Sequence, residues 1–230
     1  VTSLAFVLLL AHAVNAAEWN CTSTSGTFER TTDCNMTDEV AVSGDLTVTG
    51  NENTYTTLTA ASGERHFTIT SGAHTLRLTW LNMTGADLCT SNTDSCKGGS
   101  IHVSAVAAHL NISHCVFFNN RAGNGGAIFA HNGPKLFFSF VVFNENNADY
   151  LGGAVFLENA KLVDHSCIYT MNTAGMCGGG ISLFSGSHYS LFDSSLVNNT
   201  AGNKGGGIYI QGFSHSNLNL SSVTLQSNKQ

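Results

Sequence analysis

The sequence contains 230 residues, of which 42% are hydrophobic and only 10% are charged, and its formal net charge at pH 7 is −6. That length is enough for one domain with a sizeable core. The nine Lys and Arg residues are spread thinly and form no basic stripe, so we expect neither nucleic acid nor an anionic membrane surface as a partner. No motif in the sequence indicates a cofactor.

The first segment predicts export. Residues 1–16 form an apolar run that ends in small residues, and Val14 and Ala16 fit the cleavage site of a signal peptide. The run is too short to span a membrane, and no second long apolar run follows, so we expect no membrane span in this chain. Because an initiator Met and a basic start are missing, we expect an incomplete N-terminus, and we expect any anchor C-terminal of residue 230. The predicted location is extracellular or the cell surface, which means the outer membrane in a bacterium.

The seven cysteines belong to a chain that is expected to meet an oxidising compartment. Two local disulfides are predicted, Cys21–Cys34 and Cys89–Cys96. The first would close an N-terminal cap over residues 17–39. No C-x-x-C pair occurs, so no metal site is predicted.

Asparagine sequons are the candidate glycosylation sites. A chain this rich in Asn, Ser and Thr would contain roughly five of them by chance, so they carry little weight as evidence for a glycoprotein. The six sequons begin at Asn20, Asn35, Asn82, Asn111, Asn198 and Asn219.

Two sequence patterns recur with one period in the second half of the chain. The first is a Gly-Gly step followed by a small residue and then a β-branched residue. Its β-branched members are spaced 27, 27, 26 and 27 residues apart, at Ile101, Ile128, Val155, Ile181 and Ile208. The second pattern reads apolar-x-x-Asn-x-Ala, and its asparagines are Asn120, Asn146, Asn172 and Asn199. Two independent patterns with one period indicate a structural repeat.

Each repeat predicts one coil of a right-handed, single-stranded parallel β-helix, an all-β fold with about 27 residues per coil. The apolar residues alternate as they do in strands, and glycine and asparagine mark the corners. Equivalent residues of successive coils then stack about 4.8 Å apart in inward apolar columns. The four repeated asparagines are predicted to be structural corner residues that bond to each other in an amide ladder. The helix is expected to occupy residues 40–230 and to stop in mid-coil, with an inserted Cys loop at 87–97.

The repeat resembles a known family. The Gly-Gly-Ala-Ile step at 125–128, together with Phe-x-x-Asn at 117–120, resembles the repeat of chlamydial polymorphic outer-membrane proteins, which also occurs in exported proteins of other microbes. The stretch HFTITSGAHTLRLTWLNMTG at 66–85 is similar to the early coils of pectin-lyase-like β-helices. The first resemblance implies a surface passenger domain used in adhesion. The second implies polysaccharide cleavage as an alternative.

The sequence lacks the residue patterns that polysaccharide cleavage would need. Hydrolysis of a glycosidic bond uses two carboxylates, yet no Asp-Asp pair and no Gly-His-Gly occurs. No Gly-x-Ser-x-Gly nucleophile motif is present either. We therefore predict a secreted or cell-surface protein, non-enzymatic, that acts in adhesion or in contact with polysaccharide or a cell-surface protein. The alternative is a polysaccharide lyase or glycoside hydrolase whose catalytic coils are missing from this sequence.

The predicted contact site is the outward column that follows each repeated Ile or Val, with His102, Phe129, Phe156 and Tyr209 as the ligand-binding residues. Aromatic rings on consecutive coils would form a flat strip suited to sugar faces or to a protein partner. The alternative is that these rings rigidify the sheet or lie under a neighbouring loop. His131 lies on the coil after His102 but two residues out of register, so we predict solvated histidines and no metal site.

Overall fold

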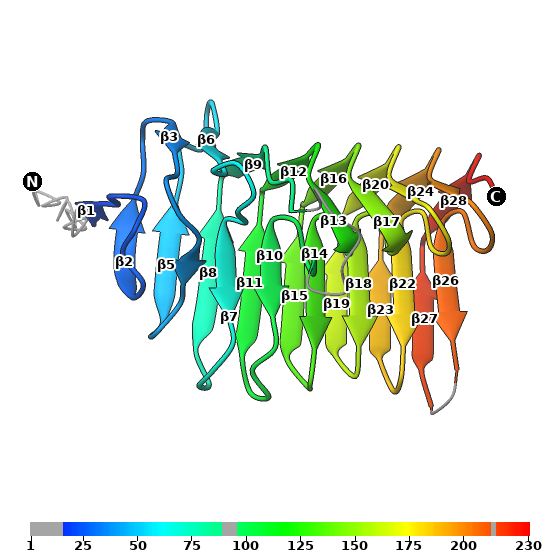
Figure 1. Cartoon of the computed structure of the whole chain (residues 1–230). Coiled ribbons are helices and arrows are strands. Elements are labelled where there is room, and N and C mark those ends of the chain that lie inside the picture. Colours follow the sequence, from blue (N-terminus) through cyan, green and yellow to red (C-terminus); the bar gives the residue numbers. More distant parts are fainter. Residues whose placement is uncertain (1–15, 89–95, 213–214) are drawn as a thin grey trace, which may run out of the picture.

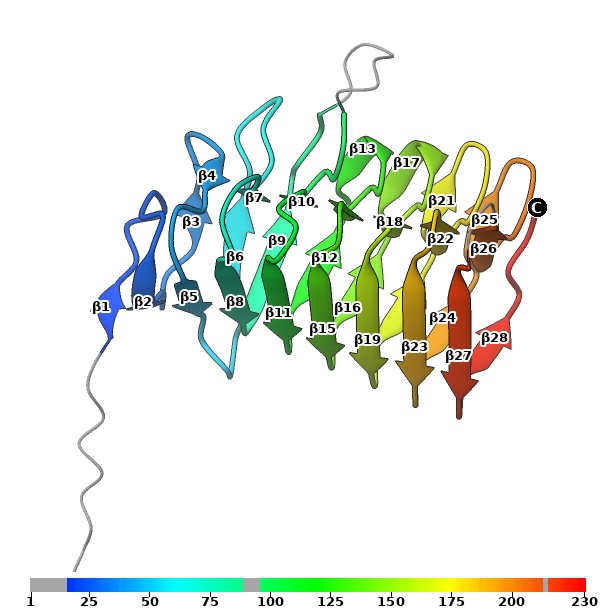
Figure 2. The same cartoon turned by 90° about the horizontal axis from the view of Figure 1, so that it is seen from below.

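The computed structural model describes residues 16–88, 96–212 and 215–230, and their regular structure is β-strand alone (Figure 1). The strands stack into an elongated solenoid that the chain winds through coil by coil (Figures 1 and 2). Strands of successive coils pair in parallel, so the prediction of an all-β parallel β-helix is confirmed. Among the described residues, no helix is long and apolar enough to cross a membrane. Nearly all of the predicted signal peptide lies outside the described residues.

Sheet A runs along the whole solenoid and has nine strands in the described part of the chain. Its strands from β8 to β27 have five residues each. In spatial order the strands are β1 (Ala17–Glu18), β2 (Gly26–Glu29), β5 (Leu46–Thr49), β8 (Thr75–Thr79), β11 (His109–Ser113), β15 (Lys135–Ser139), β19 (Lys161–His165), β23 (His188–Phe192) and β27 (Asn217–Ser221).

Sheets B and C form two further sides of the solenoid. Sheet B consists of β3 (Cys34–Asn35), β6 (Thr56–Thr59), β9 (Leu81–Thr84), β12 (Val116–Phe118), β16 (Val142–Asn144), β20 (Ile168–Thr170), β24 (Ser195–Val197) and β28 (Thr224–Gln226). Sheet C consists of β4 (Val40–Ala41), β7 (Phe67–Ile69), β10 (Ile101–Val103), β14 (Ile128–His131), β18 (Val155–Glu158), β22 (Ile181–Phe184) and β26 (Ile208–Gln211).

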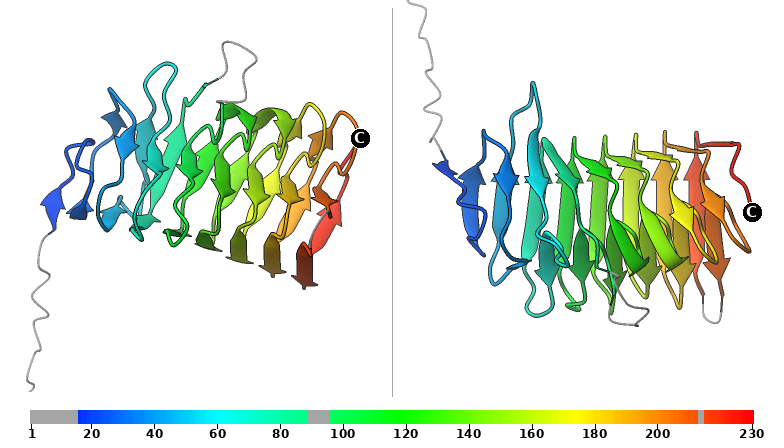
Figure 3. Two further views of the ribbon diagram at one scale, coloured as in Figure 1. Left: turned by 60° about the horizontal axis from the view of Figure 1, so that its bottom comes forward. Right: turned by 45° about the horizontal axis from the view of Figure 1, so that its top comes forward.

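Sheet D is shorter and lies on the path from sheet B to sheet C, as the turned views show (Figure 3). It consists of β13 (Arg121–Asn124), β17 (Asn147–Leu151), β21 (Thr173–Ala174) and β25 (Thr200–Ala201). Each coil from β11 to β26 therefore passes through sheets A, B, D and C in that order, whereas the coils before β11 have strands in sheets A, B and C.

The corners between sheets A and B, between sheets B and D, and between sheets D and C each contain a residue with a left-handed backbone conformation. Between sheets A and B, Phe140 has a φ of 54°, and between sheets B and D, Met171 also has a φ of 54°. Both side chains are exposed, so bulky residues fit there. Between sheets D and C the residue is always glycine, because a Cβ on Gly125 would lie 2.2 Å from the carbonyl oxygen of Ile128.

The core residues stack from coil to coil with the period that the sequence predicts. The repeated β-branched residues pair directly from coil to coil, and Ile101, Ile128 and Val155 have no exposed area. Burying one such side chain contributes about 2 kcal/mol of stability. On sheet B the rings of Phe117 and Phe143 stack with centroids 4.9 Å apart. The core is therefore a bundle of columns that run along the solenoid axis.

A ladder of buried asparagines lines the corner between sheets B and D. The Nδ2 of Asn146 donates to the carbonyl oxygen of Phe117 at 2.9 Å and to Oδ1 of Asn172 at 3.0 Å. Its Oδ1 accepts from the backbone N–H and the Nδ2 of Asn120, both at 3.1 Å. All these donors and acceptors lie within the solenoid, so the amides satisfy buried backbone groups that the sharp corner leaves unpaired. The members with no exposed area are Asn120, Asn146, Asn172 and Asn199.

The N-terminal segment 17–39 contributes strands to the same sheets. β2 pairs in parallel with β5, and β3 pairs in parallel with β6. Cys21 and Cys34 form a disulfide across this first winding. The segment predicted as a cap thus continues the coil pattern to the N-terminal end of the described solenoid.

The insertion predicted at 87–97 leaves the register intact. Leu76 pairs with Leu110, although the two are 34 residues apart in the sequence. The predicted bond Cys89–Cys96 depends on Cys89, which lies outside the described residues. Cys115 and Cys167 form no disulfide and lie in the apolar core.

Candidate functional site

Sheet A has the most strands of the four sheets among the described residues, and its outer face is a regular surface. In β11, Leu110 and Ile112 point into the core, so His109, Asn111 and Ser113 point outward. The other five-residue strands repeat this alternation in register. We call the first, third and fifth side chains of β8, β11, β15, β19, β23 and β27 the sheet A face.

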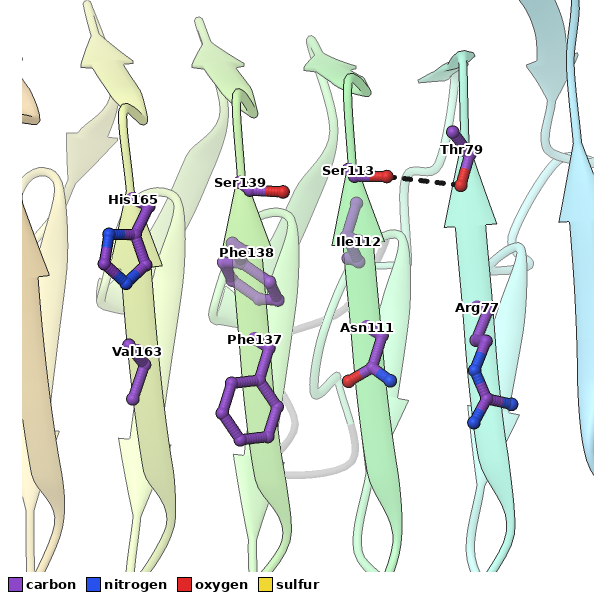
Figure 4. Close-up of a pocket in the computed structure, with 10 residues that line it drawn as sticks. All are labelled: Arg77, Thr79, Asn111, Ile112, Ser113, Phe137, Phe138, Ser139, Val163 and His165. Carbon is purple, nitrogen blue, oxygen red and sulfur yellow. Dashed lines mark hydrogen bonds between the residues drawn. The ribbon is translucent and has the colours of Figure 1, made fainter.

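A shallow groove of about 380 Å³ lies on this face. Figure 4 shows its lining side chains in two rows that cross β8, β11, β15 and β19. One row holds the third positions, Arg77, Asn111, Phe137 and Val163. The other row holds the fifth positions, Thr79, Ser113, Ser139 and His165. The groove thus combines an aromatic ring, an amide, a guanidinium and several hydroxyls.

Phe137 is the main apolar group of the groove. Its ring is 46% exposed, because it stands between Leu136 and Phe138, which both occupy inward positions. A Phe side chain that stays exposed lacks the roughly 2 kcal/mol of stability that its burial would contribute. A concave surface that combines an aromatic ring with a few polar groups is a feature of ligand-binding sites.

Aromatic residues also occupy three successive corners at the edge of the sheet A face. Trp80, His114 and Phe140 have φ values of 58°, 49° and 54°, a region that bulky residues rarely adopt. Their rings stack, with centroids 4.0 Å apart for Trp80 and His114 and 4.9 Å apart for His114 and Phe140. Stacking of about 1 kcal/mol per pair offsets a backbone cost of similar size. This corner stack borders the groove.

The sheet A face carries no carboxylate at any of its positions, all of which are described. Asp164 lies between the outward Val163 and His165, so its side chain points into the core. There its Oδ2 accepts hydrogen bonds from the hydroxyls of Tyr169 and Tyr189, and burial raises the pKa of Asp164 to about 7. The face therefore offers groups that bind a ligand, and it does not offer the carboxylate pair that glycosidic cleavage uses.

The aromatic column predicted on sheet C has the predicted register but not the predicted exposure. His102, Phe129, Phe156 and Tyr209 do follow one another, with Ser182 between the last two. However, Phe129 is only 2% exposed and Phe156 only 5%. The column is therefore no continuous exposed strip.

The chain arriving from sheet D covers this column. The Nζ of Lys97 lies 5.2 Å from the ring centroid of Phe129. The hydroxyl of Ser182 donates to the carbonyl oxygen of Cys177 at 2.8 Å. Both covering residues precede the Gly-Gly steps that lead into sheet C. The outward rings pack against that connection, with Phe129 and Phe156 stacked 4.9 Å apart.

His102 and His131 meet at one end of this column, which the offset of two residues did not predict. Their Nε2 atoms lie 3.1 Å apart, and Nη1 of Arg65 lies 3.1 Å from Nδ1 of His102. Burial, and then the positive charge of Arg65, lowers the pKa of His102 to about 3. Lys97 also lowers the pKa of both rings, while Glu158 raises the pKa of His131. The positive charges of Arg65 and Lys97 next to His102 disfavour a metal ion there. No cluster of three or more metal-binding side chains occurs among the described residues.

The sequons differ in accessibility. Asn82 and Asn111 are half-buried, and Asn111 lines the groove. The exposed ones are Asn20, Asn35, Asn198 and Asn219. Glycosylation of any of them remains a prediction.

Comparison of the chain with known protein families matches the repeat. The family model described as the Chlamydia polymorphic membrane protein repeat matches residues 114–131 and 193–211. The chain carries this repeat. Each matched segment starts at the corner after sheet A, passes through sheets B and D, and ends in sheet C. No curated protein and no solved structure matches the chain.

The matched segments therefore contain the residues that turn the chain at its corners, and they do not contain the residues that line the groove. The two segments contain the corner residues Asn120 and Asn199 and the Gly-Gly steps, which the coil needs for its turns. All strands of sheet A lie outside the matched segments. Phe137 and Arg77, which line the groove, are outside both segments.

Proposed function

We propose that this chain is a cell-surface β-helix that binds carbohydrate through the sheet A face without cleaving it. The observation that carries the proposal is the groove, where the exposed ring of Phe137 stands among hydroxyl and amide groups. Aromatic rings stack on the apolar faces of sugars, and such polar groups bond sugar hydroxyls. The lack of carboxylates on the face supports binding rather than cleavage.

The repeat supports display at a surface. Its family description names a membrane protein of Chlamydia, and the match covers the corners that build the winding. A solenoid of this kind projects its long sheets away from its point of attachment, so the sheet A face would be available to a glycan on an opposing surface. Labelling of intact cells with an antibody against this chain tests the location, and labelling only after permeabilisation would contradict it.

The binding test compares two exposed phenylalanines. The chain is screened against immobilised glycans, and Kd for the best ligand is measured by calorimetry. Phe137→Ala should weaken binding about tenfold, as expected for the loss of one aromatic contact. Phe118→Ala is the matched control, because Phe118 is 37% exposed on β12 of sheet B, away from the groove. Circular dichroism establishes that both variants fold.

Two results would contradict the proposal. If no glycan binds, or if Phe118→Ala weakens binding as much as Phe137→Ala, the groove is not the carbohydrate site. If the bound polysaccharide is shortened, with new reducing ends or unsaturated products, the non-enzymatic part is wrong.

A further inference from the structure

The sheet A face is positively charged although the chain as a whole is acidic. The chain has a formal net charge of −6, yet the face holds Arg77, Lys135 and Lys161 and no Asp or Glu. Apart from the inward Asp164 of β19, the carboxylates nearest to it in sheet A lie outside the strands of this face, and they include the exposed Glu29 of β2. Asp45, which precedes β5, accepts a hydrogen bond from the backbone of Thr75, and Asp193 follows β23. Residues spread thinly along the sequence are thus gathered on one side by the winding.

The cations of this face are not used in ion pairs. Arg30, Arg65 and Arg121 each lie within 4 Å of a carboxylate elsewhere on the solenoid. No ion pair involves Arg77, Lys135 or Lys161 among the described residues. An unpaired guanidinium or ammonium keeps its full charge for a ligand.

The lysines lie in one column. Lys135 pairs in register with Lys161, and His109 and His188 flank them on the coils before and after. Neighbouring members are about 4.8 Å apart along the axis. Arg77 lies in the next column, two coils before Lys135, so the three cations follow the long direction of the groove. A ligand that meets all three must extend across several coils.

We propose that the ligand of this face is a linear sulfated polysaccharide that lies across the strands, along the solenoid axis. This inference rests on the proposed function and names its substrate class. A sulfate ester stays ionised at every physiological pH, and its terminal oxygens accept several hydrogen bonds at once. The groove supplies such donors beside the cations, namely the amide of Asn111 and the hydroxyls of Ser113 and Ser139. The sugar rings stack on Phe137.

Charge number and shape favour a polysaccharide over other polyanions. Stable electrostatic binding to an anionic membrane uses clusters of about four to eight basic residues, and this face has three. Duplex DNA binders of strong salt dependence neutralise about six to ten phosphates. Three cations with an exposed ring and hydroxyls suit a ligand that combines sparse charge with apolar sugar faces.

The experiment measures binding of the full chain to heparin, to the same heparin after chemical desulfation, and to the neutral glycan panel. Wild-type chain should bind heparin and lose at least about tenfold in affinity on desulfation. The double variant Lys135→Gln/Lys161→Gln should weaken heparin binding about tenfold and make Kd less dependent on salt. Lys204→Gln is the matched control, because Lys204 is exposed and lies in the connection from sheet D to sheet C, outside the sheet A face. It should leave Kd unchanged.

The outcomes separate this inference from the proposed function. If neutral glycans bind in a Phe137-dependent way and sulfate adds nothing, the proposed function stands and this inference is overturned. If Lys204→Gln weakens heparin binding as much as the double variant, or if Phe137→Ala has no effect on it, the attraction is non-specific charge and the inference also falls. Equal affinity for DNA of similar charge density overturns it too. Failure of every glycan to bind refutes the proposed function itself.

Discussion

Replacing Asp164 by asparagine tests how a buried carboxyl group controls the stability of the solenoid. Asp164 occupies a core column in which its neighbours on the adjoining coils are Phe138 and Leu191. Its Oδ2 accepts hydrogen bonds from Tyr169 and from Tyr189, the second at 2.5 Å. Its Oδ1 has no hydrogen-bond partner among the described residues. The desolvation is therefore only partly compensated.

The sign of the effect follows from the pKa. Burial raises the pKa of Asp164 from 3.8 to about 7, against the lowering effect of the two tyrosine hydroxyls. The folded state then holds a proton that the unfolded state releases, so the contribution of this group is greatest below about pH 4 and is lost as pH rises to about 7. A shift of about three pKa units corresponds to a loss of about 4 kcal/mol across that window.

The assay is denaturant unfolding from pH 4 to pH 8, followed by fluorescence of Trp19 and Trp80. Asp164→Asn cannot lose a proton, so its free energy of unfolding should rise relative to the wild type by about 4 kcal/mol across this range. Other titrating groups are common to both proteins and cancel in the difference. A difference that stays constant with pH would refute the reasoning, because Asp164 would then have the same pKa in both states.

Three further changes test the corners and the crosslink. Gly153→Ala should destabilise by about 3 kcal/mol or prevent folding, because its Cβ would lie 2.0 Å from the carbonyl oxygen of Gly179; an unchanged unfolding midpoint would contradict this. Asn146→Ala should cost at least about 3 kcal/mol, since it leaves several buried partners unsatisfied, and urea unfolding measures the loss. Removing the Cys21–Cys34 bond, which closes a loop with a sequence separation of 13, should cost about 3 kcal/mol in the same assay, and an unchanged free energy of unfolding would contradict this.

The coil was predictable from sequence because its determinants repeat. Each coil from β11 to β26 has a glycine where a Cβ would strike backbone, and an inward amide where the corner leaves backbone groups unpaired. Gly125 and Asn120 therefore have counterparts at one period in these coils. Alternation within a strand then assigned Leu110 and Ile112 to the core.

Exposure was less predictable, because it depends on neighbouring segments as well as on alternation. Phe129 and Phe137 both occupy outward positions of a strand, but Phe129 lies under the connection from sheet D and is 2% exposed, whereas Phe137 is 46% exposed. The contact between His102 and His131 was also not predictable from the strand register. Long side chains reach diagonal neighbours two residues away, and these two rings do so.

The same corner geometry is consistent with the binding surface that we propose on sheet A. The link from sheet A to sheet B at His114 and Cys115 is two residues long, and the left-handed His114 turns the chain away from the sheet at once. The link from sheet D to sheet C approaches so closely that only glycine fits at Gly125, and it covers the sheet C column. Outward side chains on sheet A are thus free of the packing constraints that govern the rest of the coil. Residues such as Arg77 and Phe137 can vary with the ligand while the winding stays the same, which separates the structural repeat from the surface that we propose to bind.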